Sequence, residues 1–384
     1  MMRKAVFVGA AVIVSGSALA GLYGDTPDAK HAWSVHDGNR PNPVKVEPAA
    51  KCGGAPSDAV VLFDGTKESF EKNWCDKDGK LSLWKLGKEG DFYCEPGWVN
   101  GGSIFTREKF GDCQLHLEYR HDAELGLVSD KKGAQMHGNS GVFLMNNYEI
   151  QVLESYGTNP ADMKNPNYAD GQAGAVYAEN PPMVNPARKP GEWQVYDIVF
   201  HQPVWEGDTL LHPGSVTVFF NGVLVQDHWE MEGLTTHCKR RPLKPHDKTG
   251  PLQFQDHGCV VHFRNIWYRP LPSRWDNKTH SSMSADPAAV MALRRETAKA
   301  LFAKIADPKA VDVATLNALG EVISYANEGE YKAAFDACLA AAKDKFDDKA
   351  KAEANKALSV LVRNGILPDS AKFPEPPKKD NQKK

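Results

Sequence analysis

The chain has no Cys-x-x-Cys pair among its seven cysteines, which excludes c-type haem attachment, a thioredoxin-like redox motif and a zinc ribbon. It also has no excess of positive charge, because its formal net charge is −3, so a nucleic-acid partner is not expected. The overall composition is that of a globular protein. The 384 residues are 41% hydrophobic and 25% charged, which is enough for more than one domain with a sizeable core.

The N-terminus has the order of a secretory signal peptide. Arg3 and Lys4 precede an apolar run over residues 5–20 that closes with Ala18-Leu19-Ala20, the small-residue pattern of a cleavage site. A non-cleaved anchor is the alternative, although the run is short for a membrane span. We therefore expect an exported protein, periplasmic or extracellular and at the cell surface, with no membrane span after cleavage.

Export to an oxidising compartment predicts disulfide bonds. An even number of cysteines precedes residue 272, namely Cys52, Cys75, Cys94, Cys113, Cys238 and Cys259, and their pairing is left open. Cys338 stands apart in an Ala-rich helical pattern, where a small buried apolar role is expected.

Changes in composition divide the chain. The predicted parts are a signal peptide at 1–20, an extended leader at 21–57, a β domain at 58–272, a linker at 273–285, a helical bundle at 286–367 and a disordered tail at 368–384. In the β domain, short alternating runs have no helical pattern between them, which favours an antiparallel β-sandwich or jelly roll. Asn221-Gly222 between two β-rich runs is a hairpin signal.

One strand carries unusual polar residues. In the run 148–154, Tyr-Glu-Ile-Gln-Val-Leu-Glu, alternation places Glu149 and Gln151 on one face and apolar residues on the other. Glu154 breaks this alternation. A bulge of one residue would rotate Glu154 onto the face of Glu149, and bulges often lie beside active sites.

Six motifs in order resemble the 3-keto-disaccharide hydrolase family, which has a concanavalin A-like lectin/glucanase fold. They are Asn139-Ser140-Gly141-Val142, the run 148–154, Gly174-Ala175-Val176-Tyr177, Gly191-Glu192-Trp193, Asn221-Gly222 and the run 253–258, Gln-Phe-Gln-Asp-His-Gly. The resemblance covers the β domain and not the helical C-terminus. Two positions depart from the family: Gln194 follows the Trp where Asn is common, and Glu154 replaces a frequent Asp.

The resemblance implies cleavage of 3-keto-glycosides, by hydrolysis or by elimination and hydration. A ketone at C3 acidifies the C2 hydrogen, so the reaction needs a base, an enolate stabiliser and an acid. His257 is the candidate base, and Glu149 or Glu154 the candidate acid or water activator. The candidate substrate-binding residues are Gln151, Gln255, Arg120, Asn139, Tyr177 and Gln253, with Arg120 or a cation placed to stabilise the enolate.

Other functions remain open from the sequence. The same strand resembles the Glu-x-Asp-x-x-Glu signature of retaining glucanases, but Gln151 stands where the central acid is needed. A non-catalytic, lectin-like carbohydrate-binding module uses the same fold, and a surface-interaction protein is a third alternative. No cofactor is certain. Glu149, Gln151 and Glu154 supply oxygen ligands suited to a divalent cation such as calcium.

Overall fold

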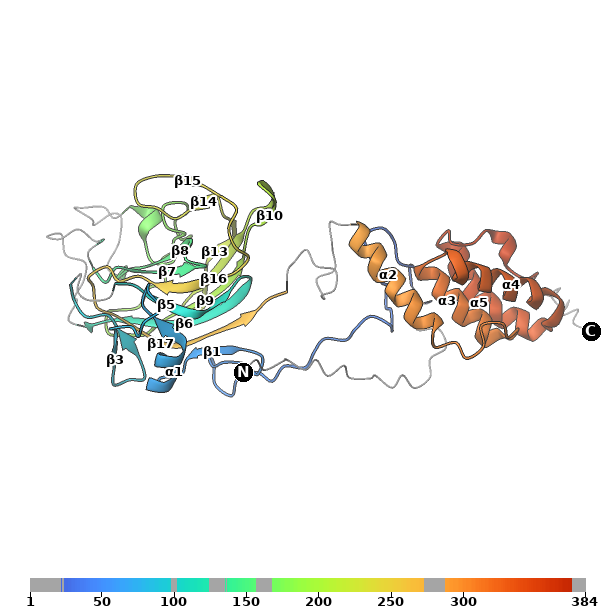
Figure 1. The fold of residues 1–384 in the computed structure, drawn as a ribbon, viewed down its shortest axis with the longest axis horizontal. Helices are drawn as coiled ribbons and strands as arrows, with labels where there is room; N and C mark the ends of the chain where they lie inside the picture. The colour runs from blue at the N-terminus through green and yellow to red at the C-terminus, as the bar shows by residue number, and fades with distance from the viewer. Residues whose placement is uncertain are drawn as a thin grey trace, which may run out of the picture. The chain divides into compact units, whose positions relative to one another are not determined.

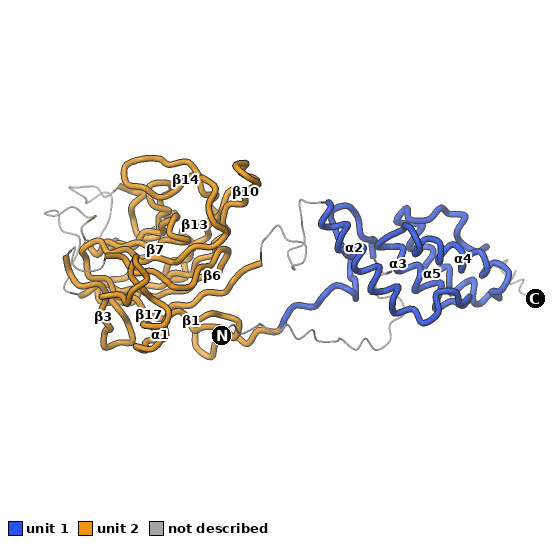
Figure 2. Tube along the Cα trace, in the orientation of Figure 1, with its two compact units in different colours: residues 1–44, 274–384 blue, residues 45–273 orange. Residues whose placement is uncertain are grey.

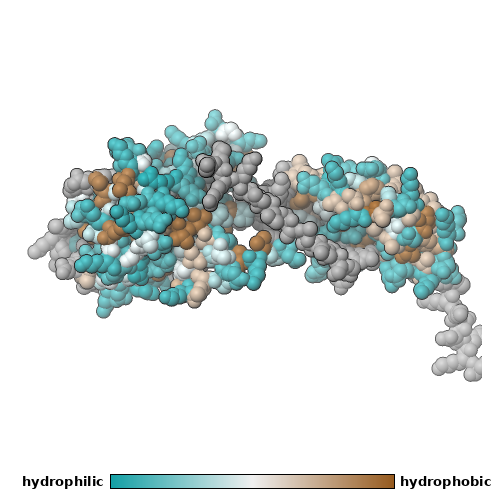
Figure 3. All heavy atoms as spheres, turned by 60° about the horizontal axis from the view of Figure 1, so that its bottom comes forward, coloured by the Kyte–Doolittle hydropathy of each residue, from teal (hydrophilic) through white to brown (hydrophobic). Residues whose placement is uncertain are grey.

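The computed structural model describes residues 22, 24–97, 102–123, 135, 137–156, 168–272 and 287–374. The predicted signal peptide and linker lie outside these ranges. The chain divides into two compact units, residues 45–273 and residues 1–44 with 274–384 (Figure 2). Figure 3 shows mainly hydrophilic side chains on the visible face of each unit. Among the described residues, no helix combines the length and apolar character needed to cross a membrane.

Within the described residues, the β unit (residues 45–273) consists mainly of two antiparallel sheets (Figure 1). The larger has eight strands: β1 (Val60–Phe63), β3 (Lys85–Leu86), β4 (Phe92–Tyr93), β6 (Cys113–His121), β9 (Gln194–His201), β12 (Ser215–Phe220), β13 (Val223–Glu230) and β17 (Val261–Pro270). The smaller has five: β2 (Trp74–Cys75), β5 (Ile104–Phe110), β7 (Ser140–Leu144), β8 (Tyr148–Val152) and β16 (Gly250–Phe254). The predicted β-sandwich is therefore confirmed.

Short elements complete this unit. They are the helix α1 (Lys67–Asn73), the 3-10 turn η3 (Ala169–Gly171) and two ribbons, β10 (Val204–Glu206) with β11 (Thr209–His212) and β14 (Gly233–Leu234) with β15 (Arg241–Pro242). The predicted hairpin joins β12 to β13, and its turn residues Asn221 and Gly222 have φ of 52° and 78°. Both positive values are those of a type I′ turn, for which Asn-Gly is the preferred pair.

Strand alternation determines which side chains enter the core between the sheets. Leu117 and Tyr119 of β6 and Ile150 and Val152 of β8 are fully buried in one hydrophobic cluster. The residues between them therefore point away from that core. Glu149 and Gln151 lie on the outer face of the five-stranded sheet, where the candidate site forms.

The described part of the helical unit (residues 1–44 and 274–384) contains four α-helices: α2 (Pro287–Phe302), α3 (Val313–Tyr325), α4 (Gly329–Lys345) and α5 (Asp348–Arg363). Side chains of Asp312 and Asp347 cap α3 and α5 by accepting backbone hydrogen bonds of 2.8 Å. The apolar faces of these helices form a core of their own. The predicted helical C-terminal domain is confirmed.

The prediction of an extended leader at 21–57 is wrong for its first part. Leu22 is buried in the helical core, and Asn39 donates a 2.6 Å hydrogen bond to Glu321 of α3. Residues 45–57 belong instead to the β unit, where the Gly53 carbonyl accepts from Asn265 and Trp267 at 2.8 and 3.0 Å. The prolines of this segment leave no helix or strand pattern in its sequence. Its side chains and backbone carbonyls nevertheless hold it against the two units without regular secondary structure.

The predicted tail at 368–384 also begins later than expected. A 3-10 turn η4 (Asp369–Ala371) follows α5, and the Phe373 side chain is buried in the helical core. Asn355 holds this end through hydrogen bonds of 2.8 and 2.9 Å to the backbone of Phe373. Residues 375–384 lie outside the described ranges.

The predicted disulfides are absent, since no two of the seven cysteines are joined. The Cys94 thiol instead donates a 2.8 Å hydrogen bond to the carbonyl of Cys259. Burial raises the pKa of Cys94 to about 12. An even cysteine count and an export signal do not bring sulfur atoms into bonding geometry, which requires specific backbone positions.

Candidate functional site

A pocket of about 200 Å³ opens on the outer face of the five-stranded sheet. Strands β7 and β8, the segment after β16 and the loop between β14 and β15 contribute its walls. The lining residues are Asn139, Phe143, Glu149, Gln151, Tyr177, Thr235, Thr236, His237, Gln255 and His257. Six of the nine candidate residues from the sequence therefore meet in one pocket, from segments more than 100 positions apart.

Glu149 lies at the floor of this pocket and is only 3% exposed. Burial raises the pKa of its carboxyl to about 8, since no described cation lies against it to offset the lost hydration. In the amide orientation that satisfies its neighbours, Gln151 donates to Glu149 Oε1 at 3.1 Å and to the Ser140 carbonyl at 3.2 Å. At neutral pH the carboxyl is therefore mainly protonated and can donate a proton.

Gly141 of β7 makes room for this carboxyl. It pairs with Gln151 across the two strands, and a Cβ at position 141 would lie 2.2 Å from Glu149 Oε1. Such a distance is far below van der Waals contact, so any side chain at position 141 would displace the carboxyl. The Asn-Ser-Gly motif thus has a steric reason for its glycine.

His257 follows β16 and is half-buried in the same pocket. Burial lowers the pKa of its imidazole, while nearby Asp256 acts in the opposite direction. The segment before His257 is held by Ser140, whose hydroxyl donates a 2.7 Å hydrogen bond to the Gln255 carbonyl. A neutral imidazole can accept a proton, which complements the protonated carboxyl of Glu149.

A chain of hydrogen bonds extends from the pocket through two tyrosines and a histidine. The Tyr177 hydroxyl lies 3.0 Å from that of Tyr168 and 2.9 Å from Nδ1 of His237. Burial raises the pKa of Tyr177, and its interaction with Tyr168 adds to this. Tyr177 therefore stays protonated and can act as a neutral hydrogen-bond donor.

Sequence reasoning missed the loop that closes the pocket. Thr235 accepts a 2.9 Å hydrogen bond from the Glu149 backbone N–H, and Thr236 and His237 continue the wall. These residues lie between two short strands and outside the six motifs, so neither alternation nor resemblance marked them.

The amide candidates differ in placement. Asn139 and Gln255 line the pocket, and Asn139 is fixed by a 2.7 Å hydrogen bond that it donates to the Gln135 carbonyl. Gln253 lies on the same strand as the segment leading to Gln255, paired with Phe143 and Phe105, but it is outside the pocket lining. The position of Gln253 outside the pocket therefore gives no support to its predicted contact with the substrate.

Arg120 was predicted to share this site, but it belongs to the other sheet. Because Leu117 and Tyr119 of β6 enter the core, Arg120 projects from the opposite, outer face of the eight-stranded sheet. There it lies 4.0 Å from Glu89 and over the ring of Trp193 at 5.2 Å. The alternation was correct, but the sequence did not show that the two polar faces lie on opposite sides of the sandwich.

Glu154 is not among the residues that line this pocket, and the paired part of β8 contains no bulge. Strand β8 pairs with β7 in continuous register from Tyr148 to Val152, so position 154 keeps the parity of the core residues. The side chain is buried, accepts a 2.8 Å hydrogen bond from the Tyr156 N–H, and interacts with the core residue Tyr119.

The proposed cation ligands therefore do not converge. Glu149 and Gln151 share the pocket, but Glu154 lies outside its lining. No group of three or more His, Cys, Asp or Glu side chains within the described ranges has the arrangement of a metal site. The residues of this pocket do not fit the ligand set that the sequence suggested for calcium.

A profile described as a 3-keto-alpha-glucoside-1,2-lyase-like domain matches residues 58–269. A crystal structure at 2.13 Å of a protein from Parabacteroides distasonis, provisionally described as a glycosyl hydrolase, is 37% identical with a TM-score of 0.52, covering 60% of this chain and 93% of that one.

A second Parabacteroides distasonis structure with the same provisional description, at 1.70 Å, is 18% identical with a TM-score of 0.41, covering 59% of this chain and all of that one. No curated protein matches. Since the profile spans more than half of the sequence and includes every residue of the pocket, the chain belongs to the family of 3-keto-alpha-glucoside-1,2-lyase-like domains.

Proposed function

We propose that this protein is an exported carbohydrate-active enzyme that cleaves 3-keto-glycosides by elimination across C1 and C2, followed by addition of water. Family membership supports the class of reaction. The observation that carries the proposal is the pairing, in one pocket, of a buried carboxyl that holds its proton and an imidazole whose pKa burial lowers. Groups with opposite protonation states are what acid–base catalysis requires.

In the first step, His257 removes the hydrogen from C2, which the neighbouring ketone makes acidic. The electron pair moves onto the ketone oxygen to form an enolate, and neutral donors of the pocket stabilise it. Tyr177, Asn139 and Gln255 offer an O–H and two amide N–H groups for this purpose. They replace Arg120, which lies on the other sheet.

In the second step, the enolate re-forms the ketone while the bond between C1 and the leaving oxygen breaks. A double bond forms between C1 and C2, and Glu149 gives its proton to the departing oxygen. Water then adds at C1, and a proton returns to C2, so elimination followed by this addition amounts to hydrolysis. Glu149 regains a proton from that water, and the proton taken by His257 balances the one returned to C2.

Ordinary retaining hydrolysis has less support. It needs two carboxylates about 5–5.5 Å apart, one of them ionised as the nucleophile. Glu149 is held in its protonated form, Gln151 has no charge, and Glu154 interacts with the core instead of lining the pocket. The proposed elimination needs only one protonated carboxyl and one base, and Glu149 and His257 line the same pocket.

The test compares 3-keto-disaccharides with their unoxidised parents. We expect release of reducing sugar only from the oxidised compounds, because an ordinary C2 hydrogen is too weakly acidic for an imidazole. His257→Ala should lower kcat by roughly 10²–10⁴-fold and abolish exchange of the C2 hydrogen with deuterium from solvent. His228→Ala, at an exposed position on β13, is the matched control.

Two results would redirect the assignment. Equal cleavage of both kinds of disaccharide would refute the elimination and favour a glucanase-type hydrolysis. Binding of sugars without turnover of either kind would favour the lectin-like alternative. Retention of C2 exchange in His257→Ala would leave the reaction class intact but assign the base to another residue, with His237 as the next imidazole in the pocket.

A further inference from the structure

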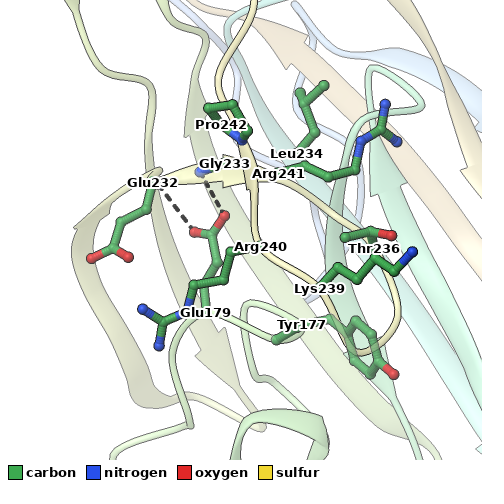
Figure 4. A pocket seen from close by; sticks show the side chains of 11 residues that line it. Tyr177, Glu179, Glu232, Gly233, Leu234, Thr236, Lys239, Arg240, Arg241 and Pro242 are labelled. Carbon is green, nitrogen blue, oxygen red and sulfur yellow. Dashed lines mark hydrogen bonds between the residues drawn. The ribbon is translucent and has the colours of Figure 1, made fainter.

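A second pocket of about 260 Å³ adjoins the candidate active site and shares Tyr177 and Thr236 with it. Figure 4 shows its side chains, which come from the segment after β8, from Glu232 before β14, and from the β14–β15 ribbon with its connecting loop. The candidate active site, at about 200 Å³, is smaller than the 300–1,000 Å³ typical of pockets for drug-sized ligands. It suits one sugar ring, so the rest of a glycoside must extend beyond it, and the second pocket is adjacent.

Three consecutive cations line this second pocket: Lys239, Arg240 and Arg241. All three are exposed, and none forms an ion pair with a carboxylate of any residue that the structure describes. In Figure 4 the charged ends of Lys239 and Arg241 lie on the same side as the hydroxyls of Thr236 and Tyr177. Those two residues are the ones that also line the active-site pocket.

The two carboxylates of the second pocket do not neutralise this group. Glu179 is engaged by the backbone, accepting hydrogen bonds from Gly233 at 2.8 Å and Glu232 at 3.2 Å (Figure 4). The Glu232 side chain extends to the opposite side of the view from Lys239 and Arg241, and the charged end of Arg240 lies on that side too. With three cations against two carboxylates, the pocket lining has a net positive charge.

We propose that this second pocket binds an anionic group, a carboxylate, sulfate or phosphate, on the leaving group of the 3-keto-glycoside. The assignment rests on the proposed function, which places the oxidised sugar ring between Glu149 and His257. What is attached at C1 then reaches Thr236 and Tyr177 and, beyond them, the cations. Arginine and lysine recognise all three anions, through paired N–H donors and a point charge respectively.

The test uses two 3-keto-glucosides that differ only in charge, with 4-carboxyphenyl and 4-carbamoylphenyl leaving groups, each as both anomers. We expect the wild-type protein to favour the carboxylate in kcat/KM by about three- to tenfold at low salt, with the preference reduced by added NaCl. A 4-sulfooxyphenyl and a 4-phosphonooxyphenyl compound then identify which anion is preferred.

Three variants give the residue assignment. The triple variant Lys239→Gln, Arg240→Gln and Arg241→Gln should bring the carboxylate-to-amide ratio close to one. The charge reversal Lys239→Glu with Arg241→Glu should invert the ratio. A control with the same loss of charge in the helical unit, Lys304→Gln, Lys309→Gln and Lys349→Gln, at three exposed positions, should keep the wild-type ratio.

The outcomes separate this inference from the function on which it rests. Turnover of both compounds with equal kcat/KM, or a preference that the triple variant retains, would overturn the anion site and leave the elimination intact. Turnover of neither compound would overturn the proposed function. In that case calorimetric binding of unoxidised 4-carboxyphenyl glucoside decides the site, and equal affinity for wild type and triple variant would overturn it.

Discussion

Replacing Glu149 by Gln should stabilise the protein increasingly as pH rises. Burial holds the carboxyl pKa near 8, against 4.5 for the hydrated group. The folded state thus binds this proton more tightly than the unfolded state, so unfolding becomes easier as pH rises from 4.5 through about 8. At 1.36 kcal/mol per pKa unit, the lost stability is about 0.8 kcal/mol at pH 5 and about 4.7 kcal/mol at pH 9.

Glutamine has the same shape without the titration, so the difference between variant and wild type isolates this carboxyl. Its unfolding free energy relative to wild type should increase by about 4 kcal/mol between pH 5 and pH 9. Denaturant titrations followed by tryptophan fluorescence measure this difference, because most tryptophans lie in the β unit. The matched control is Glu230→Gln on β13, whose side chain is exposed.

A difference that stays constant with pH would refute the reasoning. It would mean that water or an ion stabilises the Glu149 carboxylate in the folded protein, and the carboxyl would then be ionised at neutral pH. The proposed proton donation to the leaving oxygen would fail with it. A pH-dependent difference of equal size in Glu230→Gln would instead point to a general charge effect.

Three further results are expected. The pH profile of kcat/KM for a 3-keto-disaccharide, measured by a stopped assay at fixed ionic strength, should be bell-shaped. The activity should fall at high pH, near 8, because Glu149 ionises, and at low pH, below 6.5, because His257 gains a proton. Gly141→Ala should lower kcat at least about tenfold and lower the free energy of unfolding by about 1–3 kcal/mol, because the new Cβ would lie 2.2 Å from Glu149 Oε1. Gly222→Ala, at an open turn, should leave kcat unchanged. Leu22→Ala should destabilise the helical unit by about 2–5 kcal/mol and raise amide exchange in α3 and α5 only, while Val44→Ala, 81% exposed, should not.

The sequence was most informative where a period of two residues is physically enforced. Alternation placed Glu149 and Gln151 away from the core, and Asn221-Gly222 located a hairpin whose backbone angles few other residues adopt. Both signals are local, so they need no knowledge of the partner strands. The resemblance to a family added the positions of His257 and Tyr177, which no local pattern distinguishes.

The sequence was less informative where the outcome depends on tertiary structure. Nothing in β6 states which sheet it joins, so the polar face of Arg120 was assigned to the wrong side of the sandwich. A bulge before Glu154 was predicted to bring a second acid onto the face of Glu149, but Glu154 is buried and interacts with the core residue Tyr119. The loop with Thr235 and His237 has no alternating pattern in its sequence, and its place in the pocket wall depends on the β14–β15 ribbon that carries it.

The helical unit is built from both ends of the chain, so its N-terminal segment is synthesised long before its helices. Residues 22–44 emerge from the ribosome first, whereas α2 begins at residue 287, about 240 residues later. At about 5–20 residues per second, synthesis reaches α3, the first helix of the core that buries Leu22, roughly 15–60 s after Leu22 is made. The β unit, whose sequence is complete by residue 273, can fold during that interval. The N-terminal segment 22–44 is thus available to chaperones until α5 is made, and the helical core can be completed only after synthesis has passed Arg363.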